Sequence, residues 1–412
     1  MSNRALSVLT DRSRQFLELE EKYGAHNYHP LPVVLSKGSG VFLWDVDGKR
    51  YYDFLSGYSA VNQGHCHPRI VAALVEQAKV LTLTSRAFYN DCLGEYEKMI
   101  TAYFGYDKLL PMNTGVEAVE TAIKLCRRWG YAVKGIPEGR AKIVVCAGNF
   151  HGRTSTVISF STDEDSRRQF GPYMEGFVVI PYDDVDALAI ALEDKDVAGF
   201  LVEPIQGEAG VVVPRDGYLS RAKACCEAAG VLFIADEIQT GLCRTGKLLA
   251  CDHERVRPDM LILGKALSGG MLPVSAVLAD DPVMLTIGPG EHGSTYGGNP
   301  LACKVAMEAL QVLQDEGLAA KAEVLGEEFR RALRALGSPH VGEIRGKGLL
   351  NAIVIAHPHP EAAWELCLAL KDRGVLAKPT HGDKIRLAPP LVITRDQLRE
   401  CVEIVGDALC AL

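Results

Sequence analysis

Two ionisable residues stand at the ends of strongly apolar segments. Asp236 lies near the end of VLFIADE, and Lys265 ends the next such segment, MLILGK. A third feature, the polar turn at Asn113–Gly115, opens an amphipathic helix with Val116, Val119, Ile123 and Cys126 on one face. Taken alone, each feature is more typical of a helix cap or a solvated loop than of a functional site.

Together, the three features fit one kind of chemistry. An α/β sheet binds its ligand outside the carboxyl ends of the strands, and a helix N-terminus there can bind phosphate. A lysine amine can form a Schiff base with an aldehyde. A carboxylate opposite can keep a pyridine nitrogen protonated, so that the ring accepts electrons. These are the requirements of pyridoxal phosphate.

The segments that must position these residues alternate between strands and helices. Helical patterns such as GYLSRAKACCEAAG separate several short apolar runs, which are typical of a parallel sheet covered on both faces. The sequence therefore predicts an α/β fold with a large, mainly parallel sheet. The predicted strands cover 142–148, 177–182, 197–204, 231–237, 260–265 and 274–280.

The two ends of the chain have a different pattern of predicted strands and helices. GVFLWDVDGKRYYDF predicts a hairpin with its turn at Asp47-Gly48. After Asn299-Pro300 we predict one long helix over 301–336, which the segment RGKGLLNAIVIA (345–356) follows. We then predict a helix at 362–374, short strands around Leu376 and Arg386, and a final helix over 395–410. We expect three parts: 1–58, which joins a smaller α+β domain, 59–300 as the large domain, and 301–412 as the rest of the smaller one.

Composition excludes several classes of function. The chain has 412 residues, 44 Lys plus Arg, 52 Asp plus Glu, and a net charge of −8, without a basic cluster that would neutralise nucleic-acid phosphates. No apolar stretch approaches the roughly 20 residues of a membrane helix. The twelve scattered cysteines contain no CxxC pair and indicate reduced thiols. The N-terminal segment lacks a secretory signal, so we expect a cytoplasmic protein, with the mitochondrial matrix as the alternative.

Longer motifs identify a family. SGYSAVNQGHCHP, LTLTSRAFYN, LPMNTGVEA, VEPIQGEAGVVVP, GEHGSTYGGNP and AKPTHGD join the Asp236 and Lys265 segments in one pattern that runs from Tyr23 to the C-terminus. On these motifs the chain resembles the class III aminotransferases, which have the type I fold of pyridoxal-phosphate enzymes: a large, mainly parallel-sheet domain with a smaller α+β domain.

The resemblance implies a role for each cofactor residue. Lys265 would hold the cofactor aldehyde and then move the substrate proton, and Asp236 would pair with the pyridine nitrogen. Other residues would surround the ring and the phosphate: Gly115 and Val116 through backbone N–H groups, Phe150 and Ile238 on the two ring faces, Gln239 near the ring 3-oxygen, and Ser294 and Thr295 at the phosphate. Thr295 would reach the site of the partner subunit, so the resemblance implies a homodimer.

It also implies the substrates. Ornithine would give its δ-amino group to 2-oxoglutarate in a ping-pong exchange, yielding glutamate 5-semialdehyde and glutamate. Arg153 would bind the distal carboxylate and Arg386 the α-carboxylate of 2-oxoglutarate, because the guanidinium fork suits carboxylates. Glu208 would mask Arg386 while ornithine reacts. Tyr28 and Tyr58 would line the pocket, with Tyr28 near the α-amine of ornithine.

Alternatives remain at this point. N-acetylornithine or 4-aminobutyrate is the runner-up donor, and a non-catalytic binding protein on the same fold is a hypothesis of another class. The sequence departs from the expected pattern at His151, where we expect tryptophan. We expect no metal site, since His65 and His67 lie in a turn between Gly64 and Pro68.

Overall fold

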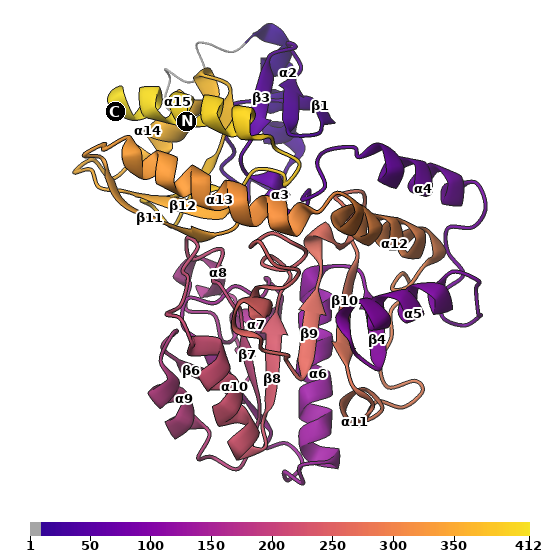
Figure 1. Cartoon of the computed structure of the whole chain (residues 1–412). Coiled ribbons are helices and arrows are strands. Elements are labelled where there is room, and N and C mark those ends of the chain that lie inside the picture. Colours follow the sequence, from indigo (N-terminus) through magenta and orange to yellow (C-terminus); the bar gives the residue numbers. More distant parts are fainter. Residues whose placement is uncertain (1–9) are drawn as a thin grey trace.

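A seven-stranded sheet forms the centre of the computed structural model, which describes residues 10–412 (Figure 1). The strand order is β4-β10-β9-β8-β7-β5-β6. The strands are β4 (Lys108–Met112), β5 (Lys142–Cys146), β6 (Phe177–Ile180), β7 (Val197–Val202), β8 (Leu232–Asp236), β9 (Met260–Leu263) and β10 (Ser275–Ala279). Strands β5 to β9 run parallel, whereas β10 pairs antiparallel with both β4 and β9. The predicted mainly parallel α/β sheet is therefore confirmed.

Alternation along the strands explains why both faces of this sheet are covered. Val145 and Ile234 belong to a core cluster with helix α6 (Gly115–Ala132), whereas their neighbours Val144 and Phe233 belong to a cluster with α9 (Val185–Ala191) and α10 (Tyr218–Ala229). Successive strand residues point to opposite faces, so continuous apolar strands bury both. Short helices α7 (Ser155–Ile158), α8 (Glu164–Arg167), α11 (Asp281–Met284) and η1 (Ala250–Glu254) lie in the connections.

The start and the end of the chain share a second sheet. Its order is β1-β2-β3-β13, formed by β1 (Leu35–Ser39), β2 (Phe42–Asp45), β3 (Arg50–Asp53) and β13 (Val375–Leu376). Between β2 and β3, the Asp45 carboxylate accepts the N–H groups of Asp47 and Lys49, and Gly48 has a φ of +85°. This is the predicted turn, because a left-handed φ at this point favours glycine.

A third sheet, which we call the C-terminal sheet, has the order β11-β12-β15-β14. It comprises β11 (Val341–Lys347), β12 (Leu350–Ile355), β15 (Lys384–Leu387) and β14 (Lys378–Thr380). Helices α13 (Leu318–Ala335) and α14 (Ala362–Asp372) pack on it, and α15 (Arg395–Cys410) packs on these two helices. The parallel pairing of β3 with β13 supports the predicted three-part division of the chain, which stays a prediction.

The single long helix predicted over 301–336 is wrong. The structure has α12 (Pro300–Asp315) and α13, separated at Gly317, whose φ is +61°. A glycine in the left-handed region is the usual helix terminator, because other residues rarely adopt that conformation. Helix α12 packs on α4 (Pro68–Ala78) and α5 (Leu93–Phe104). The first helix of the described residues is α2 (Asp11–Tyr23). Within residues 10–412, no helix is long and apolar enough to cross a membrane.

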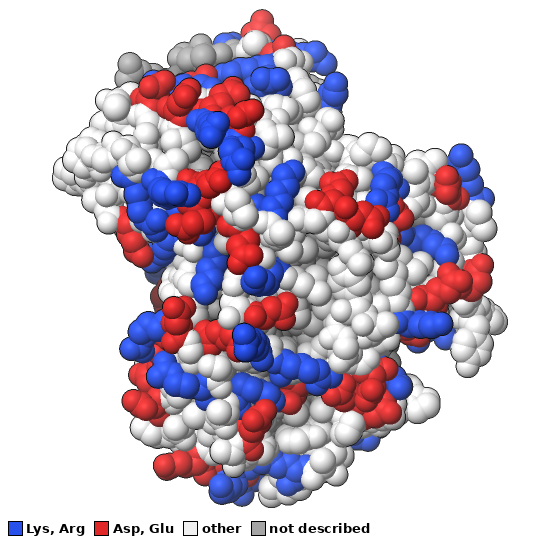
Figure 2. Space-filling view, viewed as in Figure 1, with Lys and Arg blue, Asp and Glu red and all other residues white. Residues whose placement is uncertain are grey.

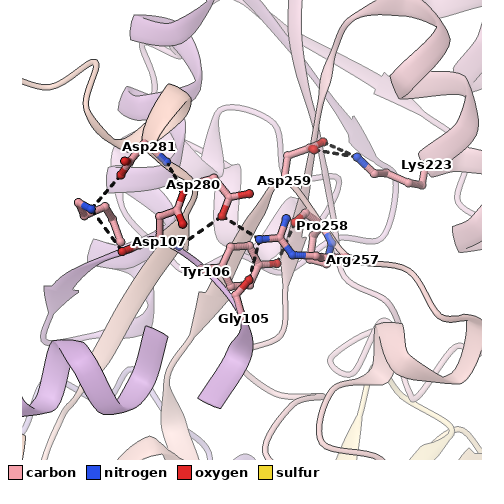
Figure 3. A network of polar contacts seen from close by, with 10 residues as sticks. Gly105, Tyr106, Asp107, Lys223, Arg257, Pro258, Asp259, Asp280 and Asp281 are labelled. Atoms are coloured by element: carbon pink, nitrogen blue, oxygen red, sulfur yellow. Dashed lines mark hydrogen bonds and ion pairs between the residues drawn. The ribbon is translucent and has the colours of Figure 1, made fainter. Parts of the chain in front are cut away.

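A polar network fixes the end of the central sheet where β8 and β9 begin (Figure 3). The Arg257 guanidinium lies 4.2 Å from the centre of the Tyr106 ring and donates to the Asp280 carboxylate at 2.8 Å. Lys223 pairs with Asp259, whose carboxylate also accepts the N–H of Phe233. At the opposite edge of the sheet, Asp236 ends β8 and Lys265 follows shortly after β9.

Charges of both signs intermingle on the surface drawn in Figure 2, so that face carries no broad basic field.

Candidate active site

One cavity at the carboxyl ends of β8 and β9 brings most predicted cofactor residues together. This is the place where an α/β sheet binds its ligand. The cavity is lined by Gly115, Val116, Phe150, His151, Gly152, Glu203, Glu208, Asp236, Ile238, Gln239, Thr240 and Lys265. Ser294 and Thr295 are the predicted cofactor residues that do not line it in this single chain.

Lys265 begins the short helix η2 (Lys265–Ser268), directly after β9 and Gly264. Its φ is +45°, a left-handed conformation that a non-glycine residue adopts only when its surroundings hold it there. Burial lowers the pKa of its amine, against the opposing influence of Glu208 and Asp236. A lowered pKa increases the fraction of neutral amine at neutral pH, which is the nucleophilic form.

Asp236 is the last residue of β8 and is almost completely buried, with 4% of its surface exposed. Its carboxylate accepts the N–H of Ile238 at 3.1 Å and lies 2.7 Å from Nδ1 of His151. Burial lowers the pKa of His151, but the hydrogen bond and the charge of Asp236 outweigh that effect, so the pKa is raised overall. This contact fixes the Asp236 carboxylate at the carboxyl end of β8, where it would pair with a pyridine nitrogen.

His151 and Glu203 are site residues to which the sequence analysis gave no role. In place of the expected tryptophan, His151 supplies the polar partner of Asp236, and its other nitrogen, Nε2, finds no hydrogen-bond partner within residues 10–412. Glu203 directly follows β7 and accepts the N–H of Phe150 at 2.8 Å. Burial raises the pKa of Glu203 to about 7. Asp236 was predicted because it is an acidic residue at the end of a buried strand. Glu203 has the same position after β7, so the same signal could have found it.

The N-terminus of α6 lies at the cavity, which Gly115 and Val116 line. Thr114 accepts the N–H of Glu117, and the Glu117 carboxylate accepts the N–H groups of Asn113 and Thr114 in a capping box. The first N–H groups of a helix have no acceptor inside the helix, so those of Gly115 and Val116 are available to an anion. A Cβ at Gly115 would lie 3.1 Å from the side chain of Ile238, so glycine keeps this approach open.

These observations match the requirements of pyridoxal phosphate. A buried amine of lowered pKa, a buried carboxylate, an aromatic ring and a free helix N-terminus line the same cavity. The donor set therefore fits the cofactor: Lys265 would take its aldehyde, Asp236 its ring nitrogen, and Gly115 and Val116 its phosphate.

The predicted substrate residues Glu208 and Arg386 form an ion pair beside this cavity. Glu208 Oε1 lies 2.6 Å from Nη1 of Arg386 and also accepts Nε2 of Gln239 at 3.0 Å. Burial raises the pKa of Glu208, but the contacts with Arg386 and Gln239 lower it by more than burial raises it. The pKa of Glu208 therefore lies below its usual value. Arg386 has 4% of its side chain exposed. A buried pair of this kind is costly to break unless another charge replaces the lost partner.

Tyr58 reaches Arg386 from a strained turn. Ser56, Gly57, Tyr58 and Ser59, which form the short element α3 (Ser56–Ser59), all have φ between 52° and 70°. Consecutive left-handed residues are costly for L-amino acids and persist only where contacts hold them. Here the Ser56 hydroxyl donates to the carbonyl of Ala388 at 2.6 Å. The turn places the Tyr58 ring 4.9 Å from the Arg386 guanidinium.

Other predicted residues do not line the cavity in the single chain. Arg153 is exposed, with its guanidinium 5.7 Å from the centre of the Phe150 ring, and Tyr28 is 67% exposed. Ser294 and Thr295 line a neighbouring pocket, together with Val116, and Ser294 accepts the side-chain N–H of Asn113 at 2.9 Å.

The geometry agrees with comparisons to known proteins. The family described as Aminotransferase class-III matches residues 23–409. The mitochondrial ornithine aminotransferase of Rattus norvegicus is 60% identical, over 98% of this chain and 94% of the relative, and that of Drosophila melanogaster is 61% identical, over 100% and 95%.

Solved structures agree as well. The ornithine aminotransferase of Toxoplasma gondii, with partial occupancy of pyridoxal phosphate at its active site, is 51% identical with a TM-score of 0.96, over 97% of this chain and 94% of that one. The acetylornithine aminotransferase of Elizabethkingia anophelis is 59% identical with a TM-score of 0.89, over 97% and 99%. With its lysine, carboxylate and helix N-terminus in one cavity, the chain belongs to the class III aminotransferase family.

Proposed function

We propose that the protein transfers the δ-amino group of L-ornithine to 2-oxoglutarate, giving L-glutamate 5-semialdehyde and L-glutamate. The observation that carries this proposal is the 2.6 Å pair between Glu208 and Arg386. An arginine that is masked when no carboxylate is present, and free when one arrives, lets one site accept two different substrates. The names of the rat and fly relatives point to the same substrate.

The chain is a pyridoxal-phosphate-dependent aminotransferase. The cofactor, when bound, supplies an aldehyde that carries the amino group between substrates and a pyridine ring that acts as an electron sink. Lys265 would hold the cofactor aldehyde and would move a proton at the carbon that bears the amino group. Asp236, in contact with His151, would pair with the ring nitrogen. Phe150 and Ile238 would lie on the two faces of the ring.

The Glu208–Arg386 pair distinguishes the two half-reactions. Ornithine reacts through its δ-amine, so no carboxylate lies near Arg386, and Glu208 neutralises the guanidinium. 2-Oxoglutarate brings an α-carboxylate next to its reacting carbon, and this group replaces Glu208 on Arg386 in a bidentate contact. Arg153 binds the carboxylate at the other end of 2-oxoglutarate.

We expect Glu208→Ala to change the choice of donor. Without the masking carboxylate, Arg386 stays available, so the rate constant for L-glutamate should rise about 10-fold or more relative to that for ornithine, as one charged contact in a buried site implies. The measurement is the half-reaction of the holoenzyme with each donor, followed by the visible absorbance of the cofactor. Lys108→Ala, at the far end of the sheet, is the control. An unchanged ratio would contradict the masking role.

A second candidate donor is N-acetylornithine, because a 59% identical solved relative is named for it. Steady-state rates on ornithine, N-acetylornithine, 4-aminobutyrate and lysine, with product detection, distinguish the candidates. A clear preference for N-acetylornithine would refute the ornithine assignment.

We also propose that the working form is a homodimer. Thr295 is exposed and lies outside the Lys265 cavity of its own chain, and Tyr28 is 67% exposed. Both observations support the proposal that a second subunit completes the site. Two-fold dimers are the commonest soluble oligomers. Light scattering of the purified protein tests this proposal, and a fully active monomer would refute it.

For the compartment, we propose the cytoplasm, with the mitochondrial matrix as the alternative. The rat and fly relatives are named mitochondrial. The first nine residues, on which a targeting signal partly depends, lie outside the described residues. Fractionation of the source cells decides between the two.

A further inference from the structure

Two side chains of the C-terminal sheet hold the main chain around Glu208. We call residues 206–212 the gate segment. The Thr380 hydroxyl donates to the main-chain carbonyl of Glu208 at 2.7 Å, and Nε of Arg345 donates to the carbonyl of Gly210 at 2.8 Å. Thr380 lies on β14 and Arg345 on β11, the two edge strands of this sheet. Arg386, the partner of the gate carboxylate, lies on β15 of the same sheet.

The backbone of the gate segment is strained, and contacts within the segment and with the C-terminal sheet hold it. Gly210 has a φ of +96° and Val211 a φ of +57°, a left-handed conformation that a β-branched residue rarely adopts. Strained residues keep such angles only where surrounding contacts hold them. Val211 is completely buried against Leu350, Ala352 and other residues, so the segment rests on the C-terminal sheet.

We propose that Thr380 is a positioning residue for substrate choice. Its hydroxyl fixes the main chain of Glu208 relative to Arg386, so the carboxylate leaves and returns by side-chain rotation alone. This inference rests on the proposed function. Small displacements of a positioning group are costly in an active site. Without the hydroxyl, the main chain of Glu208 moves, its carboxylate covers Arg386 less often, and donors with an α-carboxylate beside the reacting amine compete better with ornithine.

The test compares Thr380→Val, which removes the hydroxyl at nearly constant volume, with Thr380→Ser, which keeps it. In full-length holoenzyme, we expect Thr380→Val to raise the L-glutamate to ornithine ratio of half-reaction rate constants about 3- to 10-fold, the equivalent of one hydrogen bond. Thr380→Ser should keep the wild-type ratio. An unchanged ratio in Thr380→Val, or an equal change in both variants, would overturn the proposal.

A double variant separates positioning from a general structural role. If Thr380 acts through Glu208, then Thr380→Val adds nothing to the ratio in a Glu208→Ala background, whereas an independent effect would multiply it. Multiplied effects would overturn this proposal alone. A wild type without preference for ornithine would overturn the proposed function and this inference with it. Should Thr380→Val fail to fold, Thr380→Ala also removes the hydroxyl, and an unchanged ratio there would overturn the proposal.

Discussion

Replacement of Lys265 by alanine is expected to lower turnover by at least about 10⁴-fold, because both the covalent attachment and the proton transfer at the substrate carbon depend on this amine. The lowered pKa of Lys265 and its place in the Asp236 cavity are the reasons to assign both tasks to one residue. The measurement is kcat/KM for ornithine with 2-oxoglutarate, by detection of the semialdehyde product.

Two comparisons make this result specific. The thermal midpoint of Lys265→Ala should stay close to that of the wild type, and Lys108→Ala should keep full activity, because Lys108 forms an exposed ion pair with Asp281 far from the cavity. A Lys265→Ala protein that completes turnovers within 10-fold of the wild-type rate would refute both the assignment and the proposed function.

The second large effect concerns stability and the fully buried Arg244. Its guanidinium donates to the Asn62 side chain and to the carbonyls of Leu349 and Pro389, so it joins the central part of the chain to the C-terminal part. No carboxylate is among these acceptors, and burial lowers the pKa of Arg244 to about 9. Burial disfavours the charged guanidinium, but the side chain of Asn62 and the carbonyls of Leu349 and Pro389 need it as their hydrogen-bond donor.

We therefore expect Arg244→Met to lower the free energy of unfolding by about 3 kcal/mol or more, since each unsatisfied buried acceptor costs about 1–3 kcal/mol. Arg244→Lys should recover only part of the loss, because an ammonium cannot reproduce the planar fork. Urea unfolding of the holoenzyme measures both. Arg215→Met, which removes a largely exposed pair with Asp183, should change the free energy of unfolding far less. Equal losses in Arg244→Met and Arg215→Met would contradict the bridging role.

Some of the site follows from local sequence rules and some does not. Asp236 and Lys265 could be predicted because a polar residue at the end of a buried strand must lie at the ligand-binding edge of a parallel sheet. The pairing of Glu208 with Arg386 was predicted only from the family resemblance, because no local pattern relates residues this far apart in sequence. The same limit applies to His151, whose contact with Asp236 joins a loop to the end of β8.

Backbone conformation marks another boundary of prediction. The left-handed turn at Ser56–Ser59 contains a single glycine, and it depends on a contact with Ala388 near the other end of the chain. The local sequence therefore does not predict this turn. The break at Gly317 is different, because a glycine after a polar helix end is a local stop signal that the continuous helical pattern on both sides concealed. The antiparallel direction of β10 depends on which strands flank it, which the sequence pattern does not specify.

The pairing of β3 with β13 has a consequence for synthesis on the ribosome. Translation delivers the chain from its N-terminus, so β1 to β3 emerge long before Val375 and Leu376 exist. During that interval β3 exposes an unpaired edge, and unpaired edges are templates for association with other chains. Contacts between distant parts of a sequence also form slowly. The edge of β3 therefore stays unpaired until the last part of the chain appears, and a chain that terminates before β13 lacks the strand that covers this edge.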